Sequence, residues 1–242
     1  MVGKVYIVGA GPGRKDLLTL RAYELIKNAD VILHDELIGE VKDLLEESKA
    51  EVINVGKRSG RHRRSQDEIN EMLVEFARKG KVVVRLKGGD PCVFGRGGEE
   101  AEFLAKHCIP FEFVPGVTSA IAVPEAVGIP LTHRRYDPTL VFITGRESRE
   151  RLNWKALAEL NATIVVLMGV GRAAEIAEKL IENGKDPETL VAIIEKGFSE
   201  EQRIIITKLG KLAETEIENP AIIVIGGVVE LYDILSKFCR GD

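Results

Sequence analysis

The residues whose types and spacing most suggest chemistry stand in glycine-rich strings. Gly9, Gly11 and Gly13 directly follow a short apolar run, and glycines after a strand let the backbone approach a ligand closely. The dinucleotide-binding pattern G-x-G-x-x-G is not completed, because Arg14 occupies its last glycine position. This string alone leaves two interpretations open, a ligand loop and a tight turn that binds nothing.

A second glycine-rich string begins at Lys87, directly after the apolar run 82–86. Open α/β sheets bind ligands beyond the carboxyl ends of their strands, and Asp90 at such an end can hold an amine or a ribose hydroxyl. A third string, PGVTSA, contains Thr118 and Ser119. Either residue can cap the helix that follows, and a helix start also presents free N–H groups to a ligand carboxylate.

Charged residues supply two further candidates. Asp35 and Glu36 follow the second predicted strand, where a carboxylate faces a ligand cleft or simply begins a helix. Residues 56–64 contain five Lys or Arg side chains and no acid. This basic run is typical of a solvated loop, of a site for carboxylates or phosphates, or of an RNA contact, although the lack of aromatic residues weakens the last interpretation.

The elements that must position these residues alternate between strand and helix. Apolar runs predict strands, and amphipathic spacing or capping signals predict helices between them. This alternation is typical of a parallel sheet with helices on both faces. The predicted strands are 4–8, 31–33, 52–55, 82–86, 111–114, 140–144, 163–168, 191–194, 203–207 and 221–225, and the bounded helices are 16–28, 97–106, 119–126, 173–183 and 228–238. A further helix is predicted after a capping box formed by Ser65 and Glu68, with a stop at Gly80.

The alternation is interrupted once, in a stretch rich in proline and glycine. We therefore expect an N-terminal α/β domain over residues 1–114, a linker region over 115–138 and a C-terminal α/β domain over 139–242.

Composition excludes several classes of protein. The net charge of −4 argues against a general nucleic-acid-binding protein, and no apolar run is long enough to cross a bilayer. Cys92, Cys108 and Cys239 are an odd number at wide spacing, and the histidines have no zinc-binding spacing, so neither a disulfide framework nor a metal site is expected. The expected location is the cytoplasm.

Together these strings resemble the tetrapyrrole methylase family. The matching segments are VYIVGAGPG, LHDELI, VGKRSGRH, VVRLKGGDPCVFGRGGEE, PGVTSA, GIPLTHR, VLMGV and EEQR, which extend over nearly the whole chain. The resemblance implies two α/β domains with a ligand cleft between them and S-adenosylmethionine as the cofactor, converted to S-adenosylhomocysteine.

The resemblance also implies roles for individual residues. The family's proton acceptor corresponds to Asp35 and its proton donor to Lys57. The cofactor contacts correspond to Pro12, Gly88, Gly89, Asp90, Val93, Thr118, Ser119, Met168 and Gly197. The acidic side chains of the substrate would lie near Arg58, Arg61, Arg63, His133 and Arg134.

The implied reaction is C-methylation of uroporphyrinogen III, at C2 and C7, to give precorrin-2 for sirohaem or cobalamin biosynthesis. The expected protein is a homodimeric enzyme with a tetrapyrrole substrate and with neither a nucleic acid nor a membrane as partner. Three alternatives remain: a later corrin methyltransferase, diphthine synthase or a ribosomal RNA methyltransferase of the same family; a non-catalytic tetrapyrrole- or nucleotide-binding protein; and, more distantly, a nicotinamide oxidoreductase.

Overall fold

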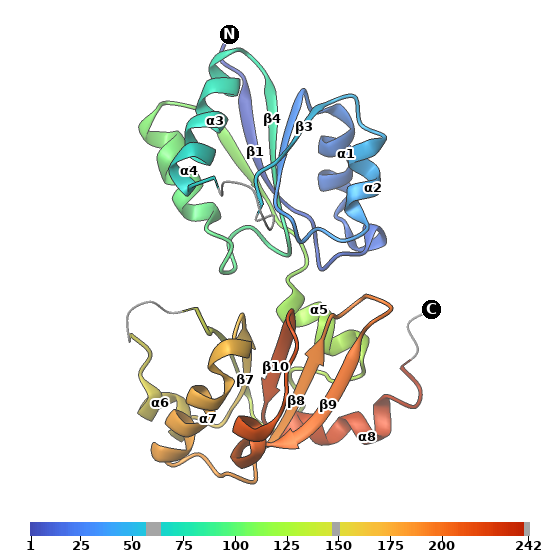
Figure 1. Cartoon of the computed structure of the whole chain (residues 1–242), viewed down its shortest axis with the longest axis vertical. Coiled ribbons are helices and arrows are strands. Elements are labelled where there is room, and N and C mark those ends of the chain that lie inside the picture. The colour runs from blue at the N-terminus through green and yellow to red at the C-terminus, as the bar shows by residue number, and fades with distance from the viewer. Residues whose placement is uncertain (57–63, 147–150, 240–242) are drawn as a thin grey trace. The chain divides into compact units, whose positions relative to one another are not determined.

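The computed structural model describes residues 1–56, 64–146 and 151–239 of the chain, and it divides into two compact units, Met1–Thr118 and Ser119–Asp242 (Figure 1). The expected α/β class is confirmed, because each unit is a five-stranded sheet covered by helices. Each unit has its own buried apolar clusters on the two faces of its sheet.

The sheet of the first unit is entirely parallel, as the alternation predicts. The strand order is β3-β2-β4-β1-β5, and every neighbouring pair is parallel. Strands covered on both faces are apolar along their whole length, which explains the near-continuous Val, Ile and Leu runs. The strands are β1 (Lys4–Gly9), β2 (Val31–His34), β3 (Glu51–Asn54), β4 (Val82–Lys87) and β5 (Phe111–Val114).

Helices cover both faces of this sheet. In Figure 1, α1 (Leu20–Asn28) and α2 (Val41–Glu46) lie on one side, and α3 (Gln66–Arg78) and α4 (Gly97–Lys106) lie on the other. The capping box of α3 is confirmed, with reciprocal bonds between Ser65 and Glu68.

The predicted helix 16–28 begins later than expected. Lys15–Leu17 is a short 3₁₀ turn, and the α-helix starts at Leu20, because the Thr19 hydroxyl accepts a hydrogen bond from the Ala22 amide and caps it there.

The sheet of the second unit is mixed. Its order is β6-β7-β10-β8-β9; β6 and β7 are parallel, and the other pairs are antiparallel. The strands are β6 (Thr139–Thr144), β7 (Ala162–Leu167), β8 (Leu190–Glu195), β9 (Arg203–Lys208) and β10 (Ala221–Ile225).

Helices again cover both faces of the second sheet. One face packs against α6 (Trp154–Glu159) and α7 (Ala173–Glu182), and the other packs against α5 (Ser119–Ala126) and the segment that follows β10. The predicted helix 228–238 is wrong in form, since a 3₁₀ helix at Gly227–Leu231 precedes a single α-turn, α8 (Tyr232–Leu235).

Part of the stretch expected as a linker region, 115–138, belongs to the second unit. Ala120, Val123, Ile129 and Leu131 are buried in the cluster that also contains β7, β8 and β10. The breaks at proline and glycine therefore mark a packed segment of that core.

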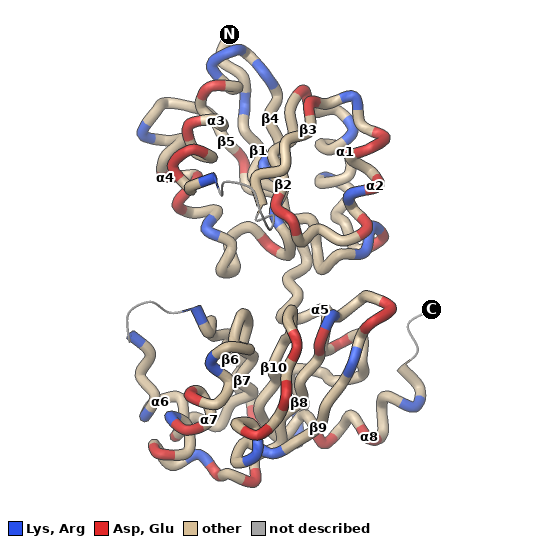
Figure 2. Tube along the Cα trace, in the orientation of Figure 1, with Lys and Arg blue, Asp and Glu red and all other residues tan. Residues whose placement is uncertain are grey.

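Charged side chains are distributed over both units, with acidic and basic residues interspersed along the outer helices (Figure 2). Many form ion pairs one helical turn apart, such as Glu75 with Lys79 and Glu102 with Lys106. No helix in the described part of the chain is both long and apolar enough to cross a membrane.

Candidate active site

The first unit has its topological switch point between β1 and β4. These strands are neighbours, yet the chain leaves β1 towards α1 on one face and leaves β4 towards α4 on the other. Open parallel sheets bind ligands at such a point, beyond the carboxyl ends of the strands. The first two glycine-rich strings of the sequence lie there.

These strings are joined backbone to backbone. The amide of Gly11 donates to the carbonyl of Gly89 at 3.2 Å, and the amide of Gly89 donates to the carbonyl of Gly11 at 2.7 Å. A Cβ atom on Gly116 would lie 2.4 Å from the Gly89 oxygen, and one on Gly9 would lie 2.6 Å from the Gly116 Cα. The loops after β1, β4 and β5 therefore meet through glycines that no other residue can replace without displacing backbone.

Asp90 connects two of these loops. Its Oδ1 accepts a hydrogen bond from the Cys92 amide at 2.8 Å, and its Oδ2 accepts one from the Gly116 amide at 3.1 Å. Each carboxylate oxygen has a second lone pair, so Asp90 can still accept from a ligand. These two hydrogen bonds hold the Asp90 carboxylate in place whether or not a ligand is bound.

Asp35 follows β2 at the same edge of the sheet. Arg85 Nη2, on β4, donates to Asp35 Oδ1 at 2.5 Å, and Lys87 Nζ lies 3.9 Å from Asp35 Oδ2. The Asp35 side chain is 34% exposed, whereas those of Arg85 and Lys87 are 2% and 4% exposed. Asp35 is thus the accessible carboxylate of an otherwise buried charge cluster.

Glu100, on α4, is the buried partner of both cations. Its Oε1 accepts from Arg85 Nε at 3.0 Å, from Lys87 Nζ at 3.0 Å and from Gln66 Nε2 at 3.1 Å. The Glu100 side chain is fully buried, and its Oε2 has no hydrogen-bond partner among the residues described. Two cations and two carboxylates give this cluster a balanced charge.

Burial is the largest influence on the pKa values of Arg85, Lys87 and the neighbouring His34. Burial lowers the pKa of Lys87, as does the neighbouring Arg85 guanidinium, while Glu100 and Asp35 oppose that shift. Burial acts most strongly on Arg85 as well, but the Glu100 and Asp35 carboxylates outweigh it and raise the pKa of Arg85. Burial also lowers the pKa of His34, whose Nδ1 donates to the Asp35 carbonyl at 2.8 Å.

The sequence reasoning found Asp35 but missed Arg85, Lys87 as a buried group, Glu100 and Gln66. A signal was present, because VVVRLK places two cations in a strand that is otherwise apolar. Charged residues are almost never fully buried unless they are paired, so a charged position inside a two-face strand predicts a buried partner.

In the second unit, two candidate cofactor residues follow strands that point the same way. Met168 follows β7 and Gly197 follows β8; these strands are both antiparallel to β10 and so end at one edge. Met168 has a φ of 54° and is exposed, and Gly197 lies between Lys196 and Phe198, which both have positive φ. The edge is formed by tight left-handed turns.

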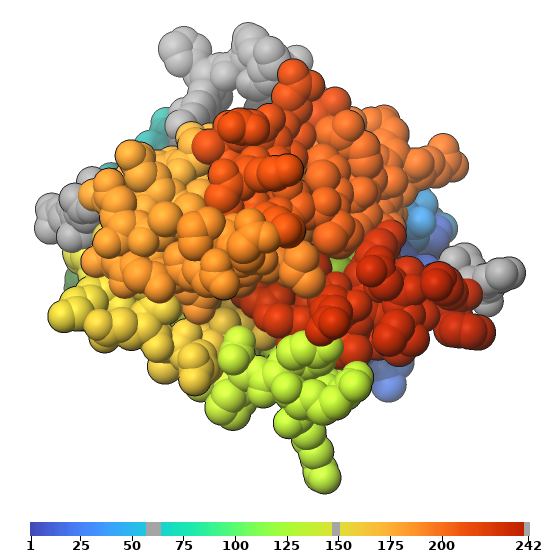
Figure 3. Space-filling model, turned by 90° about the horizontal axis from the view of Figure 1, so that it is seen from below, coloured from blue at the N-terminus to red at the C-terminus, as the bar shows by residue number. Residues whose placement is uncertain are grey.

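His133 and Arg134 line a pocket of about 670 Å³ together with Thr132, Tyr136, Asp137 and Pro138. Tyr136 is held in place, since its hydroxyl donates to Glu230 at 2.8 Å. In Figure 3 this segment lies at the surface of the second unit, beside the C-terminal residues. The pocket thus presents one histidine and one arginine to solvent.

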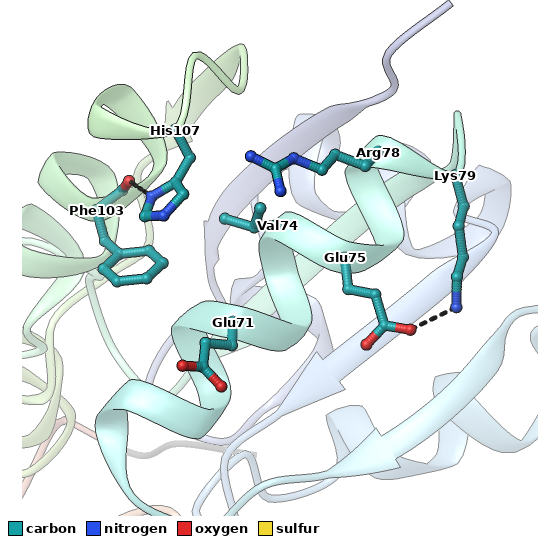
Figure 4. Close-up of a pocket in the computed structure, with 7 residues that line it drawn as sticks. All are labelled: Glu71, Val74, Glu75, Arg78, Lys79, Phe103 and His107. Carbon is teal, nitrogen blue, oxygen red and sulfur yellow. Dashed lines mark hydrogen bonds and ion pairs between the residues drawn. The ribbon is translucent and has the colours of Figure 1, made fainter.

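In the first unit, a pocket of about 470 Å³ lies between α3 and α4 (Figure 4). Glu75 pairs with Lys79 there, and His107 Nδ1 donates to the Phe103 carbonyl, so its polar groups are largely satisfied by one another. None of the predicted site residues that the structure describes lines it.

The remaining predicted residues fall into two groups. Pro12 and Val93 lie in the loops after β1 and β4, Thr118 is buried, and Ser119 begins α5. Lys57, Arg58, Arg61 and Arg63 lie outside the described residues.

The groups present fit an adenosylated amino acid. Such a ligand needs backbone donors and acceptors and a carboxylate, and the edge of the first sheet offers glycine backbone at residues 88–89 and the carboxylate of Asp90. Among the described residues no group of three or more His, Cys, Asp or Glu side chains is arranged to hold a metal ion.

Comparison with known proteins extends this description. The model of the tetrapyrrole (corrin/porphyrin) methylases matches residues 4–213. An S-adenosyl-L-methionine-dependent uroporphyrinogen III methyltransferase from Methanosarcina barkeri is 52% identical, over 97% of this chain and 95% of its own length. A siroheme synthase from Chromobacterium violaceum is 46% identical over 99% of this chain, which spans 52% of that protein.

Solved structures agree with these similarities. The crystal structure of uroporphyrin-III C-methyl transferase from Thermus thermophilus, complexed with S-adenosylhomocysteine, has a TM-score of 0.82 and 42% identity, and the match covers 94% of this chain and 99% of that one.

Proposed function

Because the chain belongs to the tetrapyrrole methylase family, we propose that it is an S-adenosylmethionine-dependent methyltransferase that converts uroporphyrinogen III into precorrin-2. The observation that carries this proposal is the 52% identity, over nearly the full length of both chains, to a relative named for that reaction. The partly exposed carboxylate of Asp35, at the switch-point edge, is the group that the geometry offers as the base of this reaction.

S-adenosylmethionine supplies the methyl group as an activated sulfonium. The acceptor is an electron-rich pyrrole carbon, so the protein contributes mainly by positioning, which is worth up to about 7–11 kcal/mol of the barrier in favourable cases. The methylated ring must then lose a proton. Asp35 accepts it, and a positioned base typically contributes about 10²–10⁴-fold in rate.

The cofactor is bound by Pro12, Gly88, Gly89, Asp90, Val93, Thr118, Ser119, Met168 and Gly197. Lys57 acts as a proton donor. The acidic side chains of the substrate pair with Arg58, Arg61, Arg63, His133 and Arg134, because guanidinium groups bind carboxylates in a bidentate manner.

The product serves sirohaem or cobalamin biosynthesis. The protein is a cytoplasmic homodimer with a small-molecule substrate and without a nucleic-acid or membrane partner. Light scattering on the purified protein tests the dimer: a monomeric mass that persists at micromolar concentration contradicts it.

An anaerobic assay tests the reaction. Purified protein is incubated with S-adenosylmethionine and uroporphyrinogen III, and the product is followed by absorbance and mass. A gain of two methyl groups is expected. Binding of S-adenosylhomocysteine without methylation of uroporphyrinogen III contradicts the proposed substrate and directs the search to precorrins and to the diphthamide precursor.

A further inference from the structure

The buried charge cluster behind Asp35 carries an inference beyond the identity of the base. A parallel strand covered on both faces normally has no charged side chain, yet β4 places Arg85 and Lys87 on the face covered by α3 and α4. Burying charges costs several kcal/mol per ion before pairing. Because burying Arg85 and Lys87 costs free energy and places them against the partly exposed carboxylate of Asp35, we expect the buried groups to serve a function at that carboxylate.

The cluster has a closed end and an open end. Glu100, at the closed end, is 0% exposed, and Arg85 and Lys87 are 2% and 4% exposed. Asp35, at the open end, is 34% exposed. One guanidinium joins the two ends, since Arg85 Nε donates to Glu100 and Arg85 Nη2 donates to Asp35.

The two oxygens of Asp35 differ as a result. Oδ1 accepts the 2.5 Å bond from Arg85. Oδ2 makes no hydrogen bond within the described part of the chain. Lys87 Nζ lies 3.9 Å from it and donates to Glu100 at 3.0 Å instead. Glu100 thus keeps the Lys87 ammonium away from Oδ2.

We propose that Glu100 is a positioning residue: it holds Arg85 against Oδ1 of Asp35 and keeps Lys87 off Oδ2, so that Oδ2 is the oxygen free to take a proton from the substrate. This inference rests on the proposed function. The step is a simple proton transfer: methylation leaves a quaternary carbon and a cationic ring, a C–H bond at an adjacent bridging carbon of the macrocycle breaks, its electron pair forms the C=C bond that neutralises the ring, and an O–H bond forms at Oδ2.

The first test is a charge rescue. In Glu100→Gln the Lys87 ammonium loses its partner and turns to Asp35 Oδ2, so kcat falls by at least about tenfold, which corresponds to about 1.4 kcal/mol. The double variant Glu100→Gln/Lys87→Met removes the competing ammonium and restores one cation facing one carboxylate. Its kcat should return to within about threefold of wild type.

The second test is a double-mutant cycle with Asp35→Asn. If Glu100 acts through Asp35, then Glu100→Gln lowers kcat by less than about twofold in the Asp35→Asn background. The affinity for S-adenosylhomocysteine should stay within about twofold in every variant. Glu102→Gln, an exposed position on the same helix, is the matched control and should behave as wild type.

A purely structural role predicts a different result. Losses that multiply in the cycle, or a double variant no more active than Glu100→Gln, overturn the inference while leaving the proposed function intact. If wild type does not methylate uroporphyrinogen III, both fail together. If Glu100→Gln does not fold, Arg85→Lys replaces it in the cycle, because a lysine cannot span the two carboxylates and should lower kcat without adding to Asp35→Asn.

Discussion

The carboxyl edges of the two sheets are built differently. In the first unit the edge holds the partly exposed carboxylate of Asp35, which lies against three buried charged groups, and its loops meet through glycine backbone. In the second unit the edge consists of turns with positive φ, at Met168, Lys196 and Phe198, and of one buried acid, Glu195. The first edge has side chains that can accept or donate a proton. The second edge has mainly backbone groups and a surface shape that a ligand can contact. Changes in the charge cluster of the first edge should therefore alter turnover, whereas changes in the turns of the second edge should alter binding.

The sharpest test of this difference is Asp35→Asn. Loss of the base should lower kcat by about 10²-fold or more, with little change in S-adenosylhomocysteine affinity measured by calorimetry. Glu36→Gln is the matched control, because Glu36 pairs with Lys42 and accepts a hydrogen bond from Asn54. Equal losses of kcat in both variants would contradict the assignment of Asp35 as the base.

A second change acts on the glycine contacts of the first edge. In Gly116→Ala the new Cβ lies 2.4 Å from the Gly89 oxygen, which is backbone and must move. We expect a loss of about 1–3 kcal/mol in the free energy of unfolding, measured by urea titration, and weaker cofactor binding. Gly98→Ala is the control, since its Cβ meets nothing within 4 Å. A free energy of unfolding equal to that of wild type would contradict this prediction and show that the loops can shift to admit the new Cβ.

A third change affects the second edge. In Gly197→Ala the new Cβ lies 2.7 Å from both Cγ atoms of Val123, so a side chain as well as the turn must shift. We expect about tenfold weaker S-adenosylhomocysteine binding, or about 1.4 kcal/mol, with kcat at saturating cofactor within about twofold. Gly171→Ala, with open space around it, is the control. A fall in kcat larger than the fall in affinity would contradict the assignment of the second edge to binding.

The smallest effect concerns the buried acid of the second edge. Glu195 Oε2 accepts from Arg203 Nε at 2.6 Å, and its Oε1 accepts from the Glu218 amide at 2.7 Å. The bond from Arg203 lowers the pKa of Glu195, despite the opposing effect of burial. The folded pKa is then below the unfolded one, so the stabilisation is present above the unfolded pKa and is lost as pH falls through the folded pKa.

Arg203→Gln should therefore lower the free energy of unfolding at pH 7 only modestly, because the arginine is half exposed and its ion pair is screened by solvent. The difference from wild type should shrink as pH falls below the ordinary glutamate pKa. Urea titrations near neutral pH and at about pH 3 check this. Lys208→Gln, in an exposed pair with Glu188, is the control, and a cost independent of pH would contradict the assigned cause.

The sequence predicted much of this architecture, for physical reasons that vary by element. The parallel strands of the first unit were visible because they are short runs of β-branched or aromatic residues, and the start of α3 was visible because Ser65 and Glu68 form a local capping signal. Helices α2 and α6 went unnoticed, since each has only six residues and too few turns for a periodic pattern.

The candidate site was predicted only where it is local in sequence. Asp35 and the glycine strings follow strands directly, so their place at the sheet edge follows from the fold class. The contact between Arg85 and Glu100 joins a strand to the next helix across a buried face, and its partner Gln66 comes from a third element. Such a cluster depends on the packing of α3 and α4, which no local pattern specifies.

The paired backbone of Gly11 and Gly89 has a consequence for motion. Their two hydrogen bonds form a separate antiparallel bridge, and the bond from the Ala10 amide to the Lys87 carbonyl joins this bridge to the end of the parallel β1–β4 ladder. Loop amides normally exchange with solvent within seconds to minutes, but amides in such a ladder are released only when the strands themselves separate. In deuterium exchange these loop amides should be protected as long as those of the central strands.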